Sequence, residues 1–199
     1  DRAGFNHRRS RDVPHPGIPR TGAGRADPGA TVCSCFSVGV NQIVGAVRGG
    51  CLTVERIADR FDGPRAPDGV IVENVLAIQK GSGDPAHVII IAGHIDSRVS
   101  DPMNFTADAP GANDDASGTA LVIEAARLLS KQKHRATIVY ALLSGEDQGL
   151  WGGRLLARHA KEKNWPVAAM LNNDIVGGIK GTDGTIVDNR VRVFSEGIR

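Results

Sequence analysis

The stretch HVIIIAGHID (residues 87–96) joins a short apolar run to two polar side chains at its end. A continuous apolar run of this length is typical of a strand that is buried on both faces of a sheet. Two further runs have the same character, ATIVYALLS (136–144) and VAAMLNND (167–174). Since such strands occur where helices cover both faces, these runs predict a largely parallel sheet.

Helical patterns alternate with these predicted strands. Residues 117–133 place apolar side chains on one face, and residues 149–163 are helical after their first glycines. A short stripe at i, i+3, i+4 and i+7 predicts a further helical segment at residues 54–61, followed by turn residues at 61–69. Strand-like runs occupy residues 70–80 and 185–195. We therefore expect an α/β fold of three layers, with a mostly parallel central sheet and helices on both faces.

Composition divides the chain into two regions near residue 50. Residues 1–50 are basic, rich in Gly and Pro, and without clear periodicity, whereas residues 51–199 hold the periodic patterns and form the predicted domain. The three cysteines are Cys33, Cys35 and Cys51. Because their number is odd and no His pair lies near them, they argue against a structural zinc site. One disulfide with a free thiol remains open.

Charge and hydropathy limit the partners that we expect. The chain has 24 Lys+Arg against 22 Asp+Glu, a balance that gives no ground for a nucleic-acid partner. No apolar run approaches the ~18 residues of a membrane span, so we expect no membrane partner. The first residues show no apolar core of a secretion signal. A mature secreted protein would have lost such a signal, and we expect a secreted or periplasmic location.

Acidic side chains and one histidine follow each of the three predicted buried strands. These residues are His94 and Asp96 after the first strand, Glu146 and Asp147 after the second, and Asp174 after the third. The pair Asp114–Asp115 ends a long loop, residues 97–113, that leaves the same edge. Ligands of α/β sheets bind at the carboxyl ends of the strands. The sequence therefore predicts one edge that gathers six acids and an imidazole.

A divalent metal explains this edge better than separate structural roles do. Taken singly, Asp114 is an ordinary helix cap, His94 a hydrogen-bonded strand end, and the remaining acids solvated loop residues. Together these carboxylates would repel one another, and several of their pKa values would rise. Imidazole and carboxylate ligands without thiolate suit Zn²⁺, Mn²⁺ or Co²⁺, and the histidine favours zinc over Mg²⁺ or Ca²⁺.

Four motifs in this order resemble the co-catalytic di-zinc aminopeptidases of the bacterial leucyl aminopeptidase type. The motifs are IIIAGHIDS (89–97), PGANDDASGTA (110–120), LLSGEDQGLWGG (142–153) and LNNDIVG (171–177). The resemblance spans residues 70–195 and implies a zinc exopeptidase-like fold. It also implies two zinc ions in an intact enzyme, and a peptide substrate with a free N-terminus.

The resemblance assigns roles to six residues, which are four metal ligands (His94, Asp114, Asp147 and Asp174) and two catalytic residues (Glu146 and Asp96). His94 and Asp174 would bind one ion, Asp147 would bind the other, and Asp114 would bridge both. Glu146 would be the general base and acid, while Asp96 would orient the imidazole of His94. In the family the bond between the paired acids is cis, which implies a cis Asp114–Asp115 peptide.

Two departures from the family pattern bear on activity. Asp147 stands where the family usually has Glu, and no histidine follows Asp174 to supply the last ligand. We therefore expect a domain that is incomplete at the C-terminus, inactive alone, and able to hold one zinc ion or none. The same fold with carboxypeptidase or glutaminyl cyclase chemistry, or a non-catalytic scaffold, remains an alternative. The sequence does not predict the oligomeric state.

Overall fold

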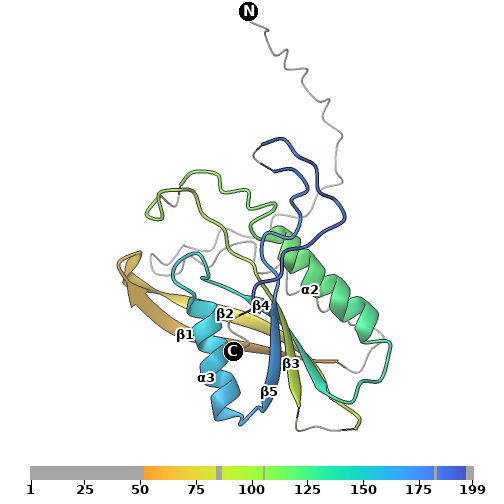
Figure 1. Ribbon diagram of the computed structural model, residues 1–199. Coiled ribbons are helices and arrows are strands. Elements are labelled where there is room, and N and C mark those ends of the chain that lie inside the picture. Colours follow the sequence, from red (N-terminus) through yellow and green to blue (C-terminus); the bar gives the residue numbers. More distant parts are fainter. Residues whose placement is uncertain (1–51, 84–86, 105, 182, 196–199) are drawn as a thin grey trace, which may run out of the picture.

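A computed structural model describes residues 52–83, 87–104, 106–181 and 183–195. These residues form one five-stranded sheet and two helices (Figure 1). The elements in chain order are β1 (Leu52–Gly63), β2 (Ala66–Gln79), β3 (Val88–His94), α2 (Ala116–Leu129), β4 (Thr137–Leu143), α3 (Trp151–Glu162) and β5 (Val167–Asn172). The basic segment predicted at residues 1–50 and the three cysteines lie outside the described residues, so the boundary near residue 50 stays a prediction.

The sheet has the strand order β1-β2-β4-β3-β5 and is mixed. β3 pairs in parallel with both β4 and β5, whereas β2 pairs antiparallel with both β1 and β4. Among the described strands, β2 therefore runs opposite to the others. Because parallel neighbours need a crossover, α2 and α3 return the chain across the sheet, and β3, β4 and β5 all end at the same edge.

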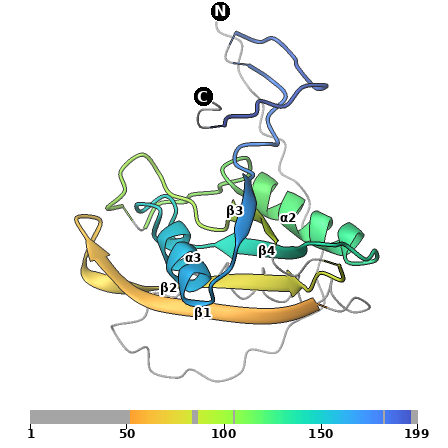
Figure 2. The same ribbon diagram turned by 60° about the horizontal axis from the view of Figure 1, so that its bottom comes forward.

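The two helices cover opposite faces of the sheet, which confirms the predicted three-layer α/β fold (Figure 2). On the α3 side, Leu76, Val139 and Trp151 belong to one buried cluster. On the α2 side, Val75 and Tyr140 belong to a second one. Successive strand residues point to opposite faces, so neighbours on β2 enter different clusters. β4 is buried on both faces, as its continuous apolar run predicts. The buried strand predicted at residues 167–174 is wrong in this respect, because β5 is an edge strand of the described sheet and its residues are exposed.

The helix predicted at residues 54–61 is wrong, because these residues form β1. β1 pairs with β2, and Val54 lies opposite Ala77 in their register. The apolar spacing at residues 54–61 does not distinguish a helix from a strand, because a strand also places residues four apart on one face. Ile57 and Phe61 both pack against the cluster on the α3 side for this reason. The turn residues predicted at 61–69 do contain the hairpin connection between β1 and β2.

The strands predicted at residues 185–195 are also wrong. In the described part of residues 175–195 the backbone forms one isolated bridge, between Lys180 and Ile186, and no strand. Val193 is 82% exposed and Phe194 is 88% exposed, so their side chains pack against little. A β-branched or aromatic residue favours a strand only where a neighbouring strand receives its side chain, and none lies beside these described residues.

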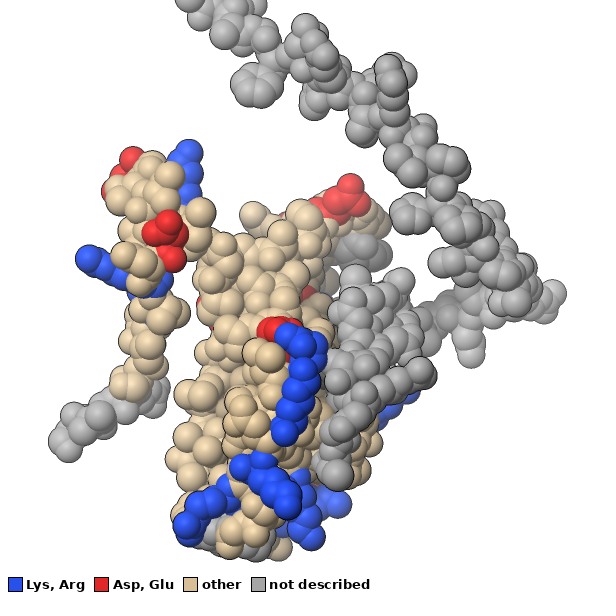
Figure 3. Space-filling model, turned by 90° about the vertical axis from the view of Figure 1, so that its right-hand side faces the viewer, with Lys and Arg blue, Asp and Glu red and all other residues tan. Residues whose placement is uncertain are grey.

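The face drawn in Figure 3 shows few charged side chains over its middle, and Lys and Arg gather at its lower end. α2 adds exposed apolar side chains, Leu121 and Leu128. Within the part of the chain that the structure describes, no helix has the length and apolar character of a membrane span.

Candidate metal and catalytic site

The predicted acids and histidine meet at the carboxyl edge of the sheet. His94 is the last residue of β3, Glu146 and Asp147 lie in the loop between β4 and α3, and Asp174 follows β5. Asp114 lies directly before the N-cap of α2. We call the residues His94, Asp96, Asp114, Glu146, Asp147 and Asp174 the edge cluster. The structure thus brings together all six residues that the sequence singled out.

His94 is the centre of the edge cluster because β3 lies between β4 and β5. Its side chain is 2% exposed. Nδ1 lies 3.0 Å from the carbonyl oxygen of Asp96, which fits an imidazole that carries its proton on Nδ1 and donates it there. The other nitrogen, Nε2, is buried and has no hydrogen-bond partner. In that tautomer the lone pair of Nε2 faces the open side of the cluster.

Carboxylate oxygens surround this unpartnered nitrogen. Nε2 of His94 lies 3.2 Å from Asp114 Oδ1, 3.9 Å from Glu146 Oε2 and 4.0 Å from Asp174 Oδ1. A lone pair that faces several carboxylates is unfavourable unless a cation or a proton lies between them. One nitrogen and several oxygens directed at one point, with no thiolate, form a donor set that suits a transition metal such as zinc.

Two overlapping groups of side chains have the spacing of metal ligands. In each, the potential ligand atoms lie within 4.8 Å of one another: one group is His94, Asp114 and Asp147, and the other is His94, Asp115 and Asp174. Asp115 fits poorly as a ligand, because its oxygens already accept three backbone hydrogen bonds. Asp114 is half exposed and closer to the His94 nitrogen, so it is the better partner for Asp174 as well.

Asp115 builds the backbone on which the cluster rests. Its carboxylate accepts hydrogen bonds from the backbone N–H groups of His94 at 3.1 Å, Gly118 at 2.9 Å and Ile175 at 3.3 Å. It is also the N-cap of α2. The Asp114–Asp115 peptide bond is cis, as the resemblance implies. Asp115 therefore joins the end of β3, the start of α2 and the segment after β5.

Asp96 has a second set of contacts that the sequence did not reveal. Its Oδ1 accepts a hydrogen bond from the backbone N–H of Glu146, and its Oδ2 accepts one from Asp147, both at 3.1 Å. The same carboxylate lies 3.6 Å from His94 Nδ1, which instead contacts the Asp96 carbonyl oxygen. The side chain of Asp96 thus fixes the loop that carries the two acids, and its main chain orients the imidazole.

The sequence matches the model of the family described as Peptidase family M28 over residues 74–191, more than half of the chain. The chain belongs to this peptidase family. A Leptosphaeria maculans protein described as "Probable zinc metalloprotease" is 47% identical over 133 residues, which are 67% of this chain and 31% of that protein. A Pyricularia oryzae protein with the same description is 44% identical over 144 residues, 72% of this chain and 28% of that protein. The M28 chain thus spans less than a third of these relatives.

Solved structures share the fold of this M28 chain. Glutaminyl cyclase from Porphyromonas gingivalis superposes with a TM-score of 0.57 at 21% identity, covering 75% of this chain and 55% of that one. LapB from Legionella pneumophila gives a TM-score of 0.52 at 22% identity, covering 70% and 36%. At such identities the likeness confirms the α/β fold alone.

The charges of the M28 edge cluster perturb one another. Burial raises the pKa of Glu146; His94 opposes this rise, and Asp147 and Asp174 add to it. Burial also raises the pKa of Asp147, and the nearby Asp96 raises it further. For His94, burial lowers the pKa, but the hydrogen bond and charge of Asp96 outweigh it and bring the value to about 9. Without a metal ion the carboxylates thus favour a protonated His94, and a cation bound at this edge would take the place of that proton.

Arg98 also belongs to the site, although the sequence motifs did not identify it. Its Nε lies 3.2 Å from Asp147 Oδ1. A second arginine, Arg65 from the β1–β2 turn, donates to the backbone oxygen of Asp147. The position of Arg98, two residues after Asp96 in the GHIDSR stretch, was the available signal.

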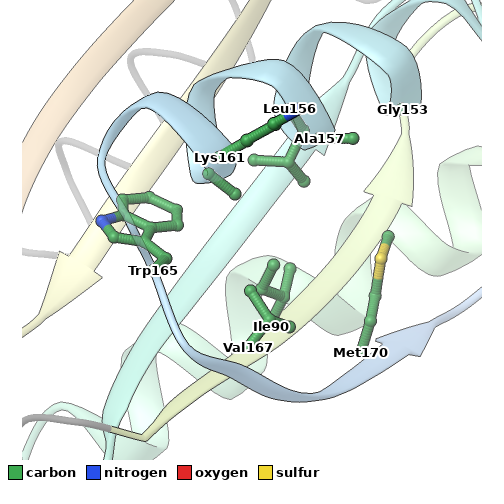
Figure 4. A pocket seen from close by; sticks show the side chains of 9 residues that line it. Ile90, Gly153, Leu156, Ala157, Lys161, Trp165, Val167 and Met170 are labelled. Carbon is green, nitrogen blue, oxygen red and sulfur yellow. The ribbon is translucent and has the colours of Figure 1, made fainter.

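Two hollows of the M28 domain lie away from the edge cluster. An apolar one of about 360 Å³ lies between α3 and the strands β3 and β5, and Ile90, Leu156 and Trp165 are among its lining residues (Figure 4). A more polar one of about 410 Å³ lies between β1 and α3. Neither contains a residue of the edge cluster, so neither of these hollows of the described chain brings a substrate to the six site residues.

Proposed function

We propose that this M28 chain carries the catalytic part of a zinc-dependent aminopeptidase, which removes N-terminal residues from peptides. The observation that supports this most is the buried, unpartnered Nε2 of His94 facing the carboxylates of Asp114, Glu146 and Asp174. The descriptions of the fungal relatives as zinc metalloproteases support zinc as the metal. The described residues fit it, since imidazole and carboxylate are common zinc ligands.

In this proposal His94, Asp114 and Asp174 would hold one zinc ion, since Asp114 and Asp174 lie 3.2 Å and 4.0 Å from Nε2 of His94. Asp114 and Asp147, which have ligand spacing, would hold part of a second site. A zinc ion held there would polarise the scissile carbonyl and lower the pKa of water. Asp96 acts through other residues, because its carboxylate binds the backbone N–H groups of Glu146 and Asp147 and its carbonyl oxygen accepts from His94. Such contacts fix the tautomer and direction of ligands.

Glu146 is the general base and acid of the proposal. Its Oε2 lies 3.9 Å from His94 Nε2, so its carboxylate borders the space that the ligands enclose. Burial raises its pKa, which brings the carboxyl group closer to the range where proton transfer is efficient near neutral pH. Glu146 accepts a proton from the attacking water and then donates it to the leaving amine. Its side chain is 30% exposed, so substrate reaches it.

The test replaces Glu146→Gln and measures zinc content and release of leucine from a leucyl peptide. Hydrolysis is measured on this chain and on a chimera that takes its following segment from the Leptosphaeria maculans relative. We expect turnover to fall by about 10²–10⁴-fold with zinc content unchanged, because only the proton-transferring group is lost. Glu162→Gln, an exposed change at the end of α3, is the matched control. Equal turnover of Glu146→Gln and wild type refutes the role.

Glutaminyl cyclase chemistry is the second candidate. One three-residue set, His94, Asp114 and Asp174, is complete within the described residues, and a single-metal enzyme needs no more. A peptide with N-terminal glutamine separates the two functions. A cyclase releases ammonia and leaves the peptide bond intact, whereas an aminopeptidase releases free glutamine.

A further inference from the structure

Arg98 holds the carboxylate of Asp147 from outside the edge cluster. Its Nε lies 3.2 Å from Asp147 Oδ1, and the two side chains are 33% and 14% exposed. The guanidinium is fixed on its other side, because Nη1 lies 3.1 Å from the carbonyl oxygen of Val99 and 3.4 Å from that of Ser100. The Arg98–Asp147 ion pair is therefore held in place by further contacts of the guanidinium.

Asp147 is held at its other end as well. Its backbone N–H donates to Asp96 Oδ2 at 3.1 Å, and Arg65 donates to its backbone oxygen. A carboxylate oxygen of Asp147 lies within 4.8 Å of ligand atoms of Asp114 and His94, while Arg98 contacts Oδ1 of the same short side chain. A cation at the Asp114–Asp147 position must therefore share Asp147 with a fixed positive charge.

The other metal position has no such competitor in the contacts of the described residues. Asp114 Oδ1 and Asp174 Oδ1 lie 3.2 Å and 4.0 Å from Nε2 of His94, and the ion pairs that the structure shows for Asp114 and Asp174 are those with His94. Both positions share Asp114, and the second one has fewer ligands among the described residues as well as an arginine on Asp147.

We propose that Arg98 makes the two metal positions unequal by occupying Asp147, so that zinc fills the His94–Asp114–Asp174 position first and the Asp114–Asp147 position weakly. This inference rests on the proposed zinc site. Arg98 is a positioning residue, since it touches a ligand and no substrate. Removing its charge frees Oδ1 of Asp147 and removes a repulsion on the second cation.

The experiment is a zinc titration of the chain by isothermal calorimetry, comparing wild type with Arg98→Ala and Arg98→Lys. We expect wild type to bind one zinc ion tightly and a second one weakly. Arg98→Ala is expected to tighten the second event by about tenfold or more and to change the first by less than about threefold. Arg98→Lys keeps the charge and loses the Nε contact. Its affinity for the second zinc ion is expected to lie between those of wild type and Arg98→Ala.

Arg65→Ala is the matched control, because it removes the same charge beside Asp147 without touching its carboxylate. If Arg65→Ala tightens binding of the second zinc ion as much as Arg98→Ala does, Arg98 has no specific role. The same conclusion follows if Arg98→Ala binds the second zinc ion no more tightly than wild type. These outcomes leave the first zinc ion, and hence the proposed function, in place. Absence of any zinc binding by folded wild type overturns both. Circular dichroism shows that each variant is folded.

Discussion

At the scale of single residues, burial separates the roles of the adjacent Asp114 and Asp115. Asp115 is 1% exposed, and its oxygens accept backbone hydrogen bonds from His94, Gly118 and Ile175. The side chain of Asp114 is 53% exposed and faces Nε2 of His94. One carboxylate is therefore committed to the backbone, while its neighbour is available to a cation.

The first prediction concerns this division of roles. Asp115→Asn is expected to lower the free energy of unfolding by about 1–3 kcal/mol, because an amide NH₂ group would face a backbone donor that has lost its acceptor. Asp114→Asn is expected to change it by less than about 0.5 kcal/mol in zinc-free buffer. Urea unfolding followed by circular dichroism measures both values. Similar losses in the two variants would show that Asp114 is structural too.

Tyr140 gives a pH prediction because it is the only tyrosine in the sequence. It is fully buried, and its hydroxyl donates to Gln79 Oε1 at 2.9 Å. Burial raises its pKa from 10.0 to about 12. Between these values the unfolded chain has lost a proton that the folded chain keeps, so stability falls as pH rises, by ~2–3 kcal/mol in all.

Ultraviolet absorbance of tyrosinate checks this directly. The native chain is expected to titrate near pH 12 and the urea-unfolded chain near pH 10. Tyr140→Phe should remove the part of the fall in stability at alkaline pH that ionisation of Tyr140 causes. A native midpoint close to that of the unfolded chain would mean that the Tyr140 hydroxyl is not buried as described.

At the scale of elements, β2 holds the loop that carries Glu146 and Asp147. Asn74 lies on β2 and is fully buried. Its Oδ1 accepts a hydrogen bond from the backbone N–H of Ser144 at 3.1 Å, and its Nδ2 donates to the carbonyl oxygen of Gly152 at 2.8 Å. One side chain therefore fixes both ends of the loop between β4 and α3, while Asp96 fixes its middle.

Asn74→Ala is predicted to lower the free energy of unfolding by about 1–3 kcal/mol, because the backbone N–H of Ser144 loses its acceptor and the carbonyl of Gly152 loses a donor. Ile71→Ala is the control on the same strand. Ile71 is 62% exposed, and a change there should cost less than about 0.5 kcal/mol. Thermal unfolding measures both. A small effect of Asn74→Ala would mean that water or a neighbouring group replaces the amide.

The sequence predicted well those elements whose hydrophobic pattern fits one kind of secondary structure. The apolar runs of β3 and β4 fit only strands buried on both faces. β1 was mistaken for a helix because Ile57 and Phe61 share a face in either structure. Asp96, Glu146, Asp147 and Asp174 were found because they follow parallel strands, and Asp114 because it ends the loop before α2. The contacts of Arg98 and Asp96 were not, because they join loops about 50 residues apart in the sequence.

At the scale of the whole molecule, the edge cluster draws on elements that lie far apart in the chain. His94 ends β3, Asp147 follows β4, Asp174 follows β5 and Asp114 precedes α2. The strand order places β3 between the other two parallel strands, which puts the imidazole at the centre. Local patterns do not encode this order, because it depends on which strands pair over long range. An unfolded chain would not hold these ligands together.

The last prediction follows from that separation. Because zinc binds the assembled cluster in the folded state only, it should stabilise the whole domain, by ~2.7 kcal/mol at one hundred times Kd. For a domain of this size the Tm should rise by about 5–10 °C. Differential scanning calorimetry with zinc and with a chelator measures the rise.

Asp174→Asn decides whether this stabilisation comes from the edge cluster. The side chain of Asp174 is 37% exposed, so the zinc-free variant should unfold at nearly the wild-type temperature. It loses a proposed ligand, and most of the rise in Tm with zinc should disappear. Mg²⁺ should give little rise in either protein, because it is a poorer partner for imidazole. If zinc stabilises Asp174→Asn and His94→Ala as much as wild type, the ion binds elsewhere and the cluster is not its site.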